Sequence, residues 1–207
     1  MKDSINVSDI IKESKKYNLF IFDFDYTLTT NQSESSIGVF TNYLSDSYKL
    51  KKKMLDKIIL GISNEKLLRL FWKIKINVLS NNLKSYNVDN ILFEKDFIIR
   101  DDFKHLFNYL LLEKKQIIIY SSGLDFVIKR ILKKNNLWSD SIKILANSVD
   151  NKVLDNVITP KKKKIDIKEK SVMIFGDKKE DLDILEYGRK FIVKDTIYLY
   201  DGDNDAR

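Results

Sequence analysis

The sequence feature that most constrains the fold is the apolar run Leu19-Phe20-Ile21-Phe22, which ends on two acidic residues, Asp23 and Asp25. A short run of aromatic and β-branched residues is typical of a strand buried on both faces, as in a parallel sheet. Carboxylates are rarely buried unless they are paired or bind a metal, and open α/β sheets bind ligands at the carboxyl ends of their strands. The pattern therefore predicts a buried strand that leads into a ligand site. On its own, however, Asp-x-Asp is equally typical of a strand that runs into a polar turn.

Composition narrows the classes of function. The chain has 207 residues and is 43% hydrophobic, which is enough for one core with an appended lobe but not for two full domains. It has no cysteine and a single histidine, His105, which excludes disulfides, thiolate or histidine-rich metal sites and a cysteine-nucleophile phosphatase. A net charge of +7 suits an anionic partner, either nucleic acid or a phosphorylated small molecule. Because the lysines are scattered, nucleic-acid binding is the less favoured of the two.

The first 18 residues are charged and lack the apolar segment of a secretory signal. No apolar run approaches the roughly 20 residues that span a bilayer. We therefore expect a soluble cytoplasmic protein, and the sequence leaves its oligomeric state open.

Strand and helix patterns alternate on both sides of a long helical block. Strand patterns cover 19–22, 116–120, 142–145, 171–175 and 191–193, and helix patterns cover 8–16, 102–115, 124–136 and a segment that ends near Gly188. The helical block has two runs between 37 and 83. The apolar positions of the first run are Phe40, Tyr43, Leu44, Leu50, Met54, Leu55, Ile58 and Ile59, and those of the second are Leu67, Leu68, Leu70, Phe71, Ile74 and Val78. Ser8 and Ser63 are the predicted N-caps, and 91–99 fits either a strand or an irregular return.

These patterns predict an α/β fold, a doubly wound parallel sheet with an inserted helical cap. The core would comprise 1–32 and 100–200, the cap 33–99, and a disordered tail 201–207.

Polar residues follow three of the strand patterns, where strands of a parallel sheet end side by side. They are Asp23 with Asp25, then Ser121 with Ser122 and Gly123, and finally Gly176-Asp177 with Asp181. A lysine from Lys161–Lys164 completes four elements in a fixed order along the chain.

In this order the four elements resemble the motifs of the haloacid dehalogenase (HAD)-like hydrolases, most of which are Mg²⁺-dependent phosphatases. The resemblance covers about 19–30 and 116–194. The insert between them has the position and size of the helical C1-type cap of phosphoserine phosphatases and pyrimidine 5′-nucleotidases. The resemblance implies a Rossmann-like core that hydrolyses a small phosphorylated metabolite through an aspartyl-phosphate.

The resemblance also implies a role for each motif residue. Asp23 would be the nucleophile, and Asp25 the acid that protonates the leaving oxygen and then activates water. The Mg²⁺ ligands would be Asp23, the backbone carbonyl of Asp25, Asp177 and, directly or through water, Asp181. Ser121 would bind the phosphoryl oxygens together with the N–H groups of Ser122 and Gly123.

The lysine and the cap residues are less closely defined. Lys162 is the first choice and Lys161 the second, while Lys152 lies at the more usual separation from Asp177. Arg69 and Glu34 are candidates for binding the remote end of the substrate, although a solvated surface position is the commoner fate of such residues. Trp72 is expected in the core and not as a platform for a base.

Two alternatives remain open at this point. A phosphomutase would share both acids of the first motif, and a non-catalytic phosphate-binding or nucleic-acid-binding protein needs no catalysis. An acid at position 25 favours a phosphate ester over a carbon–halogen bond as the substrate, by the same resemblance. Phosphoserine, nucleoside monophosphates and sugar phosphates all fit.

Overall fold

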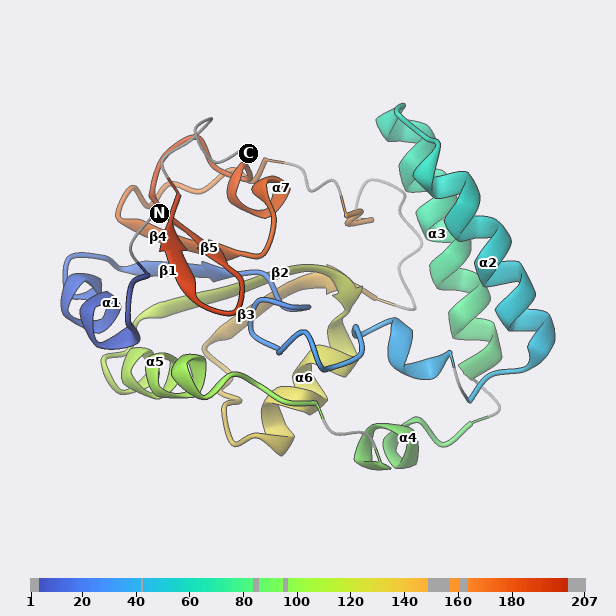
Figure 1. Ribbon diagram of the computed structural model, residues 1–207, viewed down its shortest axis with the longest axis horizontal. Helices are drawn as coiled ribbons and strands as arrows, with labels where there is room; N and C mark the ends of the chain where they lie inside the picture. Colours follow the sequence, from blue (N-terminus) through green and yellow to red (C-terminus); the bar gives the residue numbers. More distant parts are fainter. Residues whose placement is uncertain are drawn as a thin grey trace.

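The fold centres on a six-stranded sheet with the strand order β3-β2-β1-β4-β5-β6 (Figure 1). The computed structural model describes residues 4–41, 43–83, 86–94, 97–148, 157–160 and 164–200. The strands are β1 (Leu19–Phe22), β2 (Gln116–Leu124), β3 (Ile142–Asn147), β4 (Val172–Gly176), β5 (Arg189–Val193) and β6 (Ile197–Leu199). All neighbouring strands pair in parallel except β5 and β6, which are antiparallel. The α/β fold with a mostly parallel sheet is therefore confirmed, and β6 is an addition that the sequence pattern did not predict.

β1 lies in the middle of the sheet, which explains its continuous apolar run. Phe20 and Phe22 belong to the larger hydrophobic cluster on one face, and Leu19 and Ile21 belong to the smaller cluster on the other. All four are 0–2% exposed. Because both faces of the strand are covered, side chains on either face are apolar. The strand therefore lacks the alternation of polar and apolar residues that a half-exposed strand shows.

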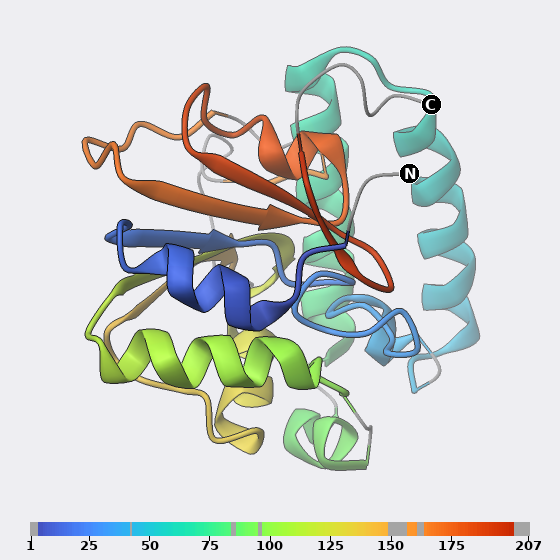
Figure 2. The ribbon, with the colours of Figure 1, turned by 60° about the vertical axis from the view of Figure 1, so that its left-hand side comes forward.

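Helices cover the two faces unequally (Figure 2). The larger cluster is covered by α1 (Val7–Ser14), α5 (Asp101–Leu112) and α6 (Asp125–Lys134), and the smaller one by α7 (Lys179–Leu182) with Ile165 and Ile167. The helix predicted after β4 is present as α7, but its predicted end near Gly188 is wrong, because α7 stops at Leu182. Ile184 and Leu185 are nevertheless buried in the smaller cluster, so they fill the core from a turn.

A helical segment connects β1 to α5. It comprises η1 (Gly38–Phe40), α2 (Asp46–Leu60), α3 (Glu65–Leu83) and α4 (Val88–Glu94). α2 and α3 pack against each other as an antiparallel hairpin, and the carboxyl ends of β1 and β2 point toward it (Figure 1). The ambiguous stretch 91–99 is the end of α4 followed by a return, where Ile99 forms a bridge with Thr29.

Two predicted N-caps are wrong by one or two residues. Asn6, not Ser8, caps α1 by accepting a hydrogen bond from the N–H of Asp9. At α3 the Asn64 side chain accepts from the N–H of Leu67, so Asn64 takes the place predicted for Ser63. Asn and Ser serve equally well as N-caps, which is why composition alone misplaced the boundary.

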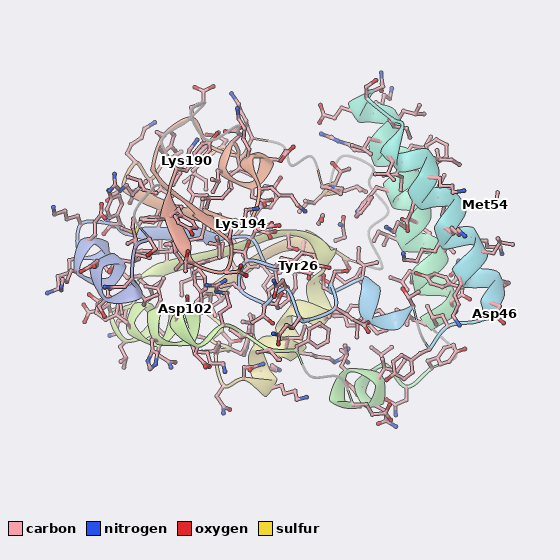
Figure 3. All side chains as sticks on the ribbon, viewed as in Figure 1. Tyr26, Asp46, Met54, Asp102, Lys190 and Lys194 are labelled. Carbon is pink, nitrogen blue, oxygen red and sulfur yellow. The ribbon has the colours of Figure 1, made fainter. Side chains whose placement is uncertain are left out.

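The apolar positions predicted for α2 and α3 divide between the two sides of the hairpin: Leu68 is buried, and Ile59 and Val78 pack against the larger cluster. Leu50 and Met54 are 62% and 58% exposed, and Figure 3 shows Met54 on the outer side of α2. Ile58, Leu67, Leu70 and Ile74 are exposed as well. The inner side of the hairpin combines buried apolar residues of α3, among them Trp72, Ile76 and Leu79, with the charged side chains described below. No helix among the described residues is long and apolar enough to cross a membrane.

Phe175 on β4 anchors the larger cluster. Its ring stacks on Phe22 and Phe191 at centroid distances of 4.7 and 4.8 Å and meets the edge of Phe103. We predict that Phe175→Ala lowers the free energy of unfolding by about 3–5 kcal/mol, because it leaves a cavity in the centre of the sheet. Urea denaturation measures the change, and Leu112→Ala, at a position 81% exposed, is the matched control with an effect within about 0.5 kcal/mol. Equal losses of unfolding free energy in Phe175→Ala and Leu112→Ala would contradict the central packing role of Phe175.

Candidate active site

Three carboxylates meet where β1 and β4 end. Ligand oxygens of Asp23, Asp177 and Asp181 all lie within 4.8 Å of one another. Asp23 directly follows β1, and its N–H donates to the carbonyl of Phe175 at 2.9 Å. Asp181, on α7, accepts a hydrogen bond from the N–H of Lys178 at 3.2 Å. The structure thus brings together three of the acids that the sequence pattern singled out.

Burial makes this acid cluster electrostatically unfavourable. Asp23 and Asp181 are 8% and 6% exposed. The pKa of Asp177 is raised to about 7, first by burial and then by the neighbouring charges of Asp23 and Asp181. The Lys178 ammonium, 3.6 Å from the Asp177 carboxylate, opposes this shift. A set of close, mutually repelling oxygen donors fits a hard divalent cation such as Mg²⁺, which would relieve the repulsion.

Two glycines allow the chain to approach itself closely at this site. A Cβ at Gly176 would collide with the side chain of Asp181, and a Cβ at Gly123 would collide with the hydroxyl of Ser36. Both glycines belong to motifs that the sequence pattern singled out. A glycine is therefore needed at each position, because the backbone there packs closely against a polar side chain of the site.

Asp25 lies beside the acid cluster but is not part of it. Its carboxylate accepts hydrogen bonds from the N–H and the hydroxyl of Ser36 at 2.7 and 2.8 Å. The intervening Tyr26 has a φ of 66°, a left-handed conformation in which its N–H donates to the hydroxyl of Thr29. Ser36 is fully buried, and sequence reasoning missed it because a serine in a polar loop carries no signal for a partner eleven residues away.

The serine motif lies within β2 and not after it. β2 continues to Leu124, so the predicted strand end at Tyr120 is wrong. Ser121 is 1% exposed and accepts a hydrogen bond from the N–H of Gly123 at 3.0 Å. Ser122 contributes to the cavity described below, together with Asp23. The strand is longer than predicted because it continues to pair with β3 beyond a register shift.

Asn147, at the end of β3, joins two segments of the site. Its amide donates to the carbonyls of Ser122 and Ile158 at 2.7 and 2.8 Å. Its side-chain oxygen accepts from the N–H of Ile158 at 2.9 Å. Sequence reasoning missed this residue, because an asparagine near a strand end ordinarily indicates a turn.

The candidate lysines lie for the most part outside the described residues. This applies to Lys161, Lys162 and Lys152. Pro160, the last described residue before the lysine run, lines the cavity next to Asp23. Lys164 pairs with Glu186 on the surface, where both side chains are mostly exposed. The lysine assignment therefore stays a prediction.

A cavity of about 190 Å³ separates the acid cluster from the α2–α3 hairpin. The sheet side contributes Asp23, Asp25, Asp177 and Asp181, and the hairpin side contributes Lys52, Trp72 and Lys75. Trp72 is 6% exposed, so it is largely buried as expected, but it also faces this cavity. Tyr26, labelled in Figure 3 near the ends of the strands, lines this cavity as well. It also lines a wider neighbouring cavity of about 730 Å³, together with Asp102 and Lys194.

The two cap residues proposed from the sequence lie elsewhere. Arg69 is 6% exposed and forms an ion pair with Glu65 one turn earlier on α3. Neither Arg69 nor Glu34 is among the described residues that line these two cavities. Their roles in substrate binding stay predictions.

Comparison with known families identifies the chain. Residues 63–193, which include α3, β2 and the Gly-Asp motif, match the model of the pyrimidine 5′-nucleotidase (UMPH-1) family. The chain belongs to the pyrimidine 5′-nucleotidase family. It is therefore a HAD-like phosphoric monoester hydrolase, as the sequence motifs predicted. The match begins after Asp23 and Asp25 and does not include those two acids.

Solved structures with the same fold include a nucleotidase. Cytosolic 5′-nucleotidase IIIB bound to cytidine has a TM-score of 0.66 at 16% identity, covering 89% of this chain and 75% of that one. The HAD-hydrolase YfnB from Bacillus subtilis, bound to magnesium, has a TM-score of 0.42 at 16% identity over 82% and 84% of the chains. A HAD-superfamily hydrolase from Ehrlichia chaffeensis has a TM-score of 0.43 at 19% identity over 84% and 86%. No curated protein sequence matches this chain significantly.

The raised pKa of Asp177 predicts how pH and metal affect stability. An acid whose pKa is raised by folding stabilises the folded state below pH 4, and this contribution is lost as the pH rises through about 7. We predict that Asp177→Asn raises the melting temperature of the metal-free protein at pH 8 by about 2–4 °C, because it removes one repelling charge. The advantage over the wild type should shrink toward pH 5.

The same variant should lose the response to Mg²⁺. Differential scanning fluorimetry should show that Mg²⁺ stabilises the wild type more at pH 8 than at pH 5.5, because protons compete for the ligand oxygens. Asp183→Asn, at an exposed position near α7, is the matched control and should respond like the wild type. An undiminished Mg²⁺ response in Asp177→Asn would exclude Asp177 as a ligand.

Proposed function

We propose that the protein hydrolyses a small phosphomonoester through an aspartyl-phosphate on Asp23. In this proposal Mg²⁺ is held by Asp23, Asp177, Asp181 and the backbone carbonyl of Asp25. The observation that carries the proposal is the meeting of three carboxylates, two of them buried and Asp177 half-buried, within 4.8 Å at the ends of two neighbouring strands. Such a cluster destabilises the folded protein, and binding a cation together with a phosphate would offset that cost.

Asp23 would attack the phosphorus in line with the leaving oxygen. Two unit charges of like sign about 4 Å apart repel by about 4 kcal/mol at an effective dielectric of about 20, so the attack needs charge neutralisation. Bound Mg²⁺ would supply that neutralisation for both the carboxylate and the phosphate. The hydroxyl of Thr27, which donates to Asp23 at 3.2 Å, would hold the other carboxylate oxygen in position.

Asp25 would protonate the leaving oxygen and then take a proton from the water that hydrolyses the aspartyl-phosphate. The two hydrogen bonds from Ser36 fix the orientation of this carboxylate and support the role. Ser121 and the N–H groups of Ser122 and Gly123 would bind the phosphoryl oxygens. Lys162, or in its place Lys161, would add the positive charge that the family's third motif supplies.

Residues 33–99 would serve as the cap that closes over the site and excludes water. The position of Lys52, Trp72 and Lys75 opposite the acids supports this division into core and cap. Nucleoside 5′-monophosphates are the first substrates to test, in view of the family's name and the cytidine bound to the nucleotidase of the same fold. Phosphoserine and sugar phosphates complete the panel.

We predict that Asp23→Asn abolishes Mg²⁺-dependent phosphate release from every substrate of the panel, because the amide is a poor nucleophile. The loss should exceed about 10³-fold while the melting temperature is kept. Phosphate release is measured with and without Mg²⁺, and Asp183→Asn is the control that retains activity. Full activity of Asp23→Asn would refute the mechanism.

General acid catalysis by Asp25 predicts a dependence on the leaving group. Asp25→Asn should slow the hydrolysis of alkyl phosphates by about 10²–10⁴-fold, the range of general acid–base catalysis, and p-nitrophenyl phosphate by less. The reason is that p-nitrophenolate leaves with little protonation. Ser36→Ala should change rates in the same direction by a smaller factor, since it only releases the carboxylate. Equal losses for both kinds of substrate would argue that Asp25 has no acid role.

A further inference from the structure

The turn between β5 and β6 lies beside the residue that follows β4, Asp177. β4 and β5 pair in parallel with Gly176 opposite Ile192, so the chain leaves these two strands at neighbouring points. The Lys194 ammonium donates a hydrogen bond to the main-chain carbonyl of Asp177 at 2.6 Å. Charged donors make stronger hydrogen bonds than neutral ones. The register of two strands thus places a lysine on the backbone of one acid of the cluster.

This contact differs from the one that Lys178 makes with the same residue. The Lys178 ammonium lies 3.6 Å from the carboxylate of Asp177, whereas the Lys194 ammonium binds its main chain. A donor on the carboxylate competes with a cation for the ligand oxygens. A donor on the carbonyl leaves those oxygens available and fixes the peptide group next to the side chain. Lys194 is therefore placed to orient Asp177 without occupying its ligand oxygens.

Arg100 holds the turn that carries Lys194. Its guanidinium donates to the main-chain carbonyl of Lys194 and, at 3.0 Å, to that of Asp195. Its Nε and Nη2 donate to the two carboxylate oxygens of Asp102 at 3.2 and 3.0 Å. Four of the roughly five N–H donors of an arginine are thereby used. Because its side chain is only 13% exposed, Arg100 forms a well-fixed link between α5 and the β5–β6 turn.

The α5 end of this link is attached to the core. The N–H of Arg100 donates to the carbonyl of Leu28 at 3.0 Å, in the segment that follows β1. The N–H of Phe103 donates to the Asp102 carboxylate at 2.9 Å, and the Phe103 ring meets the ring of Phe175 edge-on. The packed core therefore determines where Arg100 holds the turn.

The acid cluster explains why the main chain of Asp177 needs to be held. Its carboxylate lies within 4.8 Å of those of Asp23 and Asp181, and like charges at this distance repel one another. Without a bound cation, this repulsion favours movement of Asp177 away from the other two acids. A hydrogen bond from Lys194 to the backbone opposes that movement and keeps the three acids ready for a metal.

We propose that Lys194 and Arg100 are positioning residues for the binding of Mg²⁺. Arg100 fixes the β5–β6 turn, and Lys194 on that turn fixes the main chain of Asp177. The inference rests on the proposed function in that Asp177 is taken as a ligand of the metal. Both residues act through Asp177 and not by contact with the metal. Partners of this kind typically change the affinity of a metal site by about 10- to 100-fold.

Isothermal titration of the metal-free protein with Mg²⁺ measures this role without a substrate. Lys194→Met removes the ammonium and keeps the length of the side chain, so we expect the dissociation constant to rise by about 10-fold or more. Lys194→Arg keeps a charged donor and should restore most of the affinity. A lysine that acted only through its charge would have the opposite effect, because loss of a nearby positive charge strengthens the binding of a cation.

Lys115→Met is the matched control. The Lys115 ammonium also donates to a main-chain carbonyl, that of Tyr17 at 2.8 Å, but at the opposite end of the sheet, where β1 and β2 begin. Both variants therefore lose the same kind of hydrogen bond. Lys115→Met should bind Mg²⁺ like the wild type, even if its melting temperature falls. Equal losses of Mg²⁺ affinity in Lys115→Met and Lys194→Met would overturn the positioning role.

A double-mutant cycle tests whether Arg100 acts through Lys194. Arg100→Lys keeps a charge for Asp102 but removes the planar group that reaches both carbonyls of the turn. It should weaken Mg²⁺ binding by a smaller factor than Lys194→Met does. If the arginine acts through the lysine, the double variant binds Mg²⁺ no more weakly than Lys194→Met alone. Losses that multiply in the double variant would overturn the link between the two residues.

The outcomes separate this inference from the proposed function. Unchanged or tighter Mg²⁺ binding by Lys194→Met, with Mg²⁺-dependent phosphate release by the wild type, would overturn the positioning role and leave the proposed function standing. Weaker binding by Lys194→Met, with a wild type that binds Mg²⁺ but hydrolyses no substrate of the panel, would support the positioning role and refute the proposed function. A wild type that binds no Mg²⁺ would refute both.

Discussion

The mutual repulsion of Asp23, Asp177 and Asp181 is the constraint on which the rest of the structure depends. Two of the acids follow neighbouring strands and the third lies on the adjoining helix, so the sheet order alone brings them together. Holding them there raises the pKa of Asp177 and costs folding free energy. The stacked phenylalanines beneath β1 and β4 supply apolar burial at the same point. Apolar burial in the core thus offsets the folding free energy that the acid cluster costs in the absence of a ligand.

The features of the fold and the site that the sequence predicts best are those that the order of the strands determines. A run of four apolar residues that ends on Asp23 predicts a central strand, because parallel strands bury both faces. The convergence of Asp23 with Asp177 then follows from topology and needs no knowledge of side chains. Ser36 and Asn147 could not be predicted in this way. Their hydrogen bonds reach partners 11 and 25 residues away in sequence, and no local pattern encodes such a pairing.

The hairpin shows where hydrophobic periodicity misleads. The pattern at Leu50, Met54 and Ile58 has the correct helical spacing, yet these residues face outward. Periodicity assumes that the inner face of a helix packs on an apolar core. Here part of the inner face lines a cavity, and Lys52 and Lys75 lie there beside buried apolar residues such as Ile76. The two sides of the cavity therefore carry opposite charge, with acids on the sheet and lysines on the hairpin.

The three hydrogen bonds of Asn147 tie the serine-bearing strand β2 to the backbone at Ile158, two residues before Pro160. The Ile158 segment is consequently held in register with β2, the strand that carries the serine motif. A single side chain thus sets the spacing between two parts of the cavity wall, at Ser122 and Pro160, that lie far apart in the sequence.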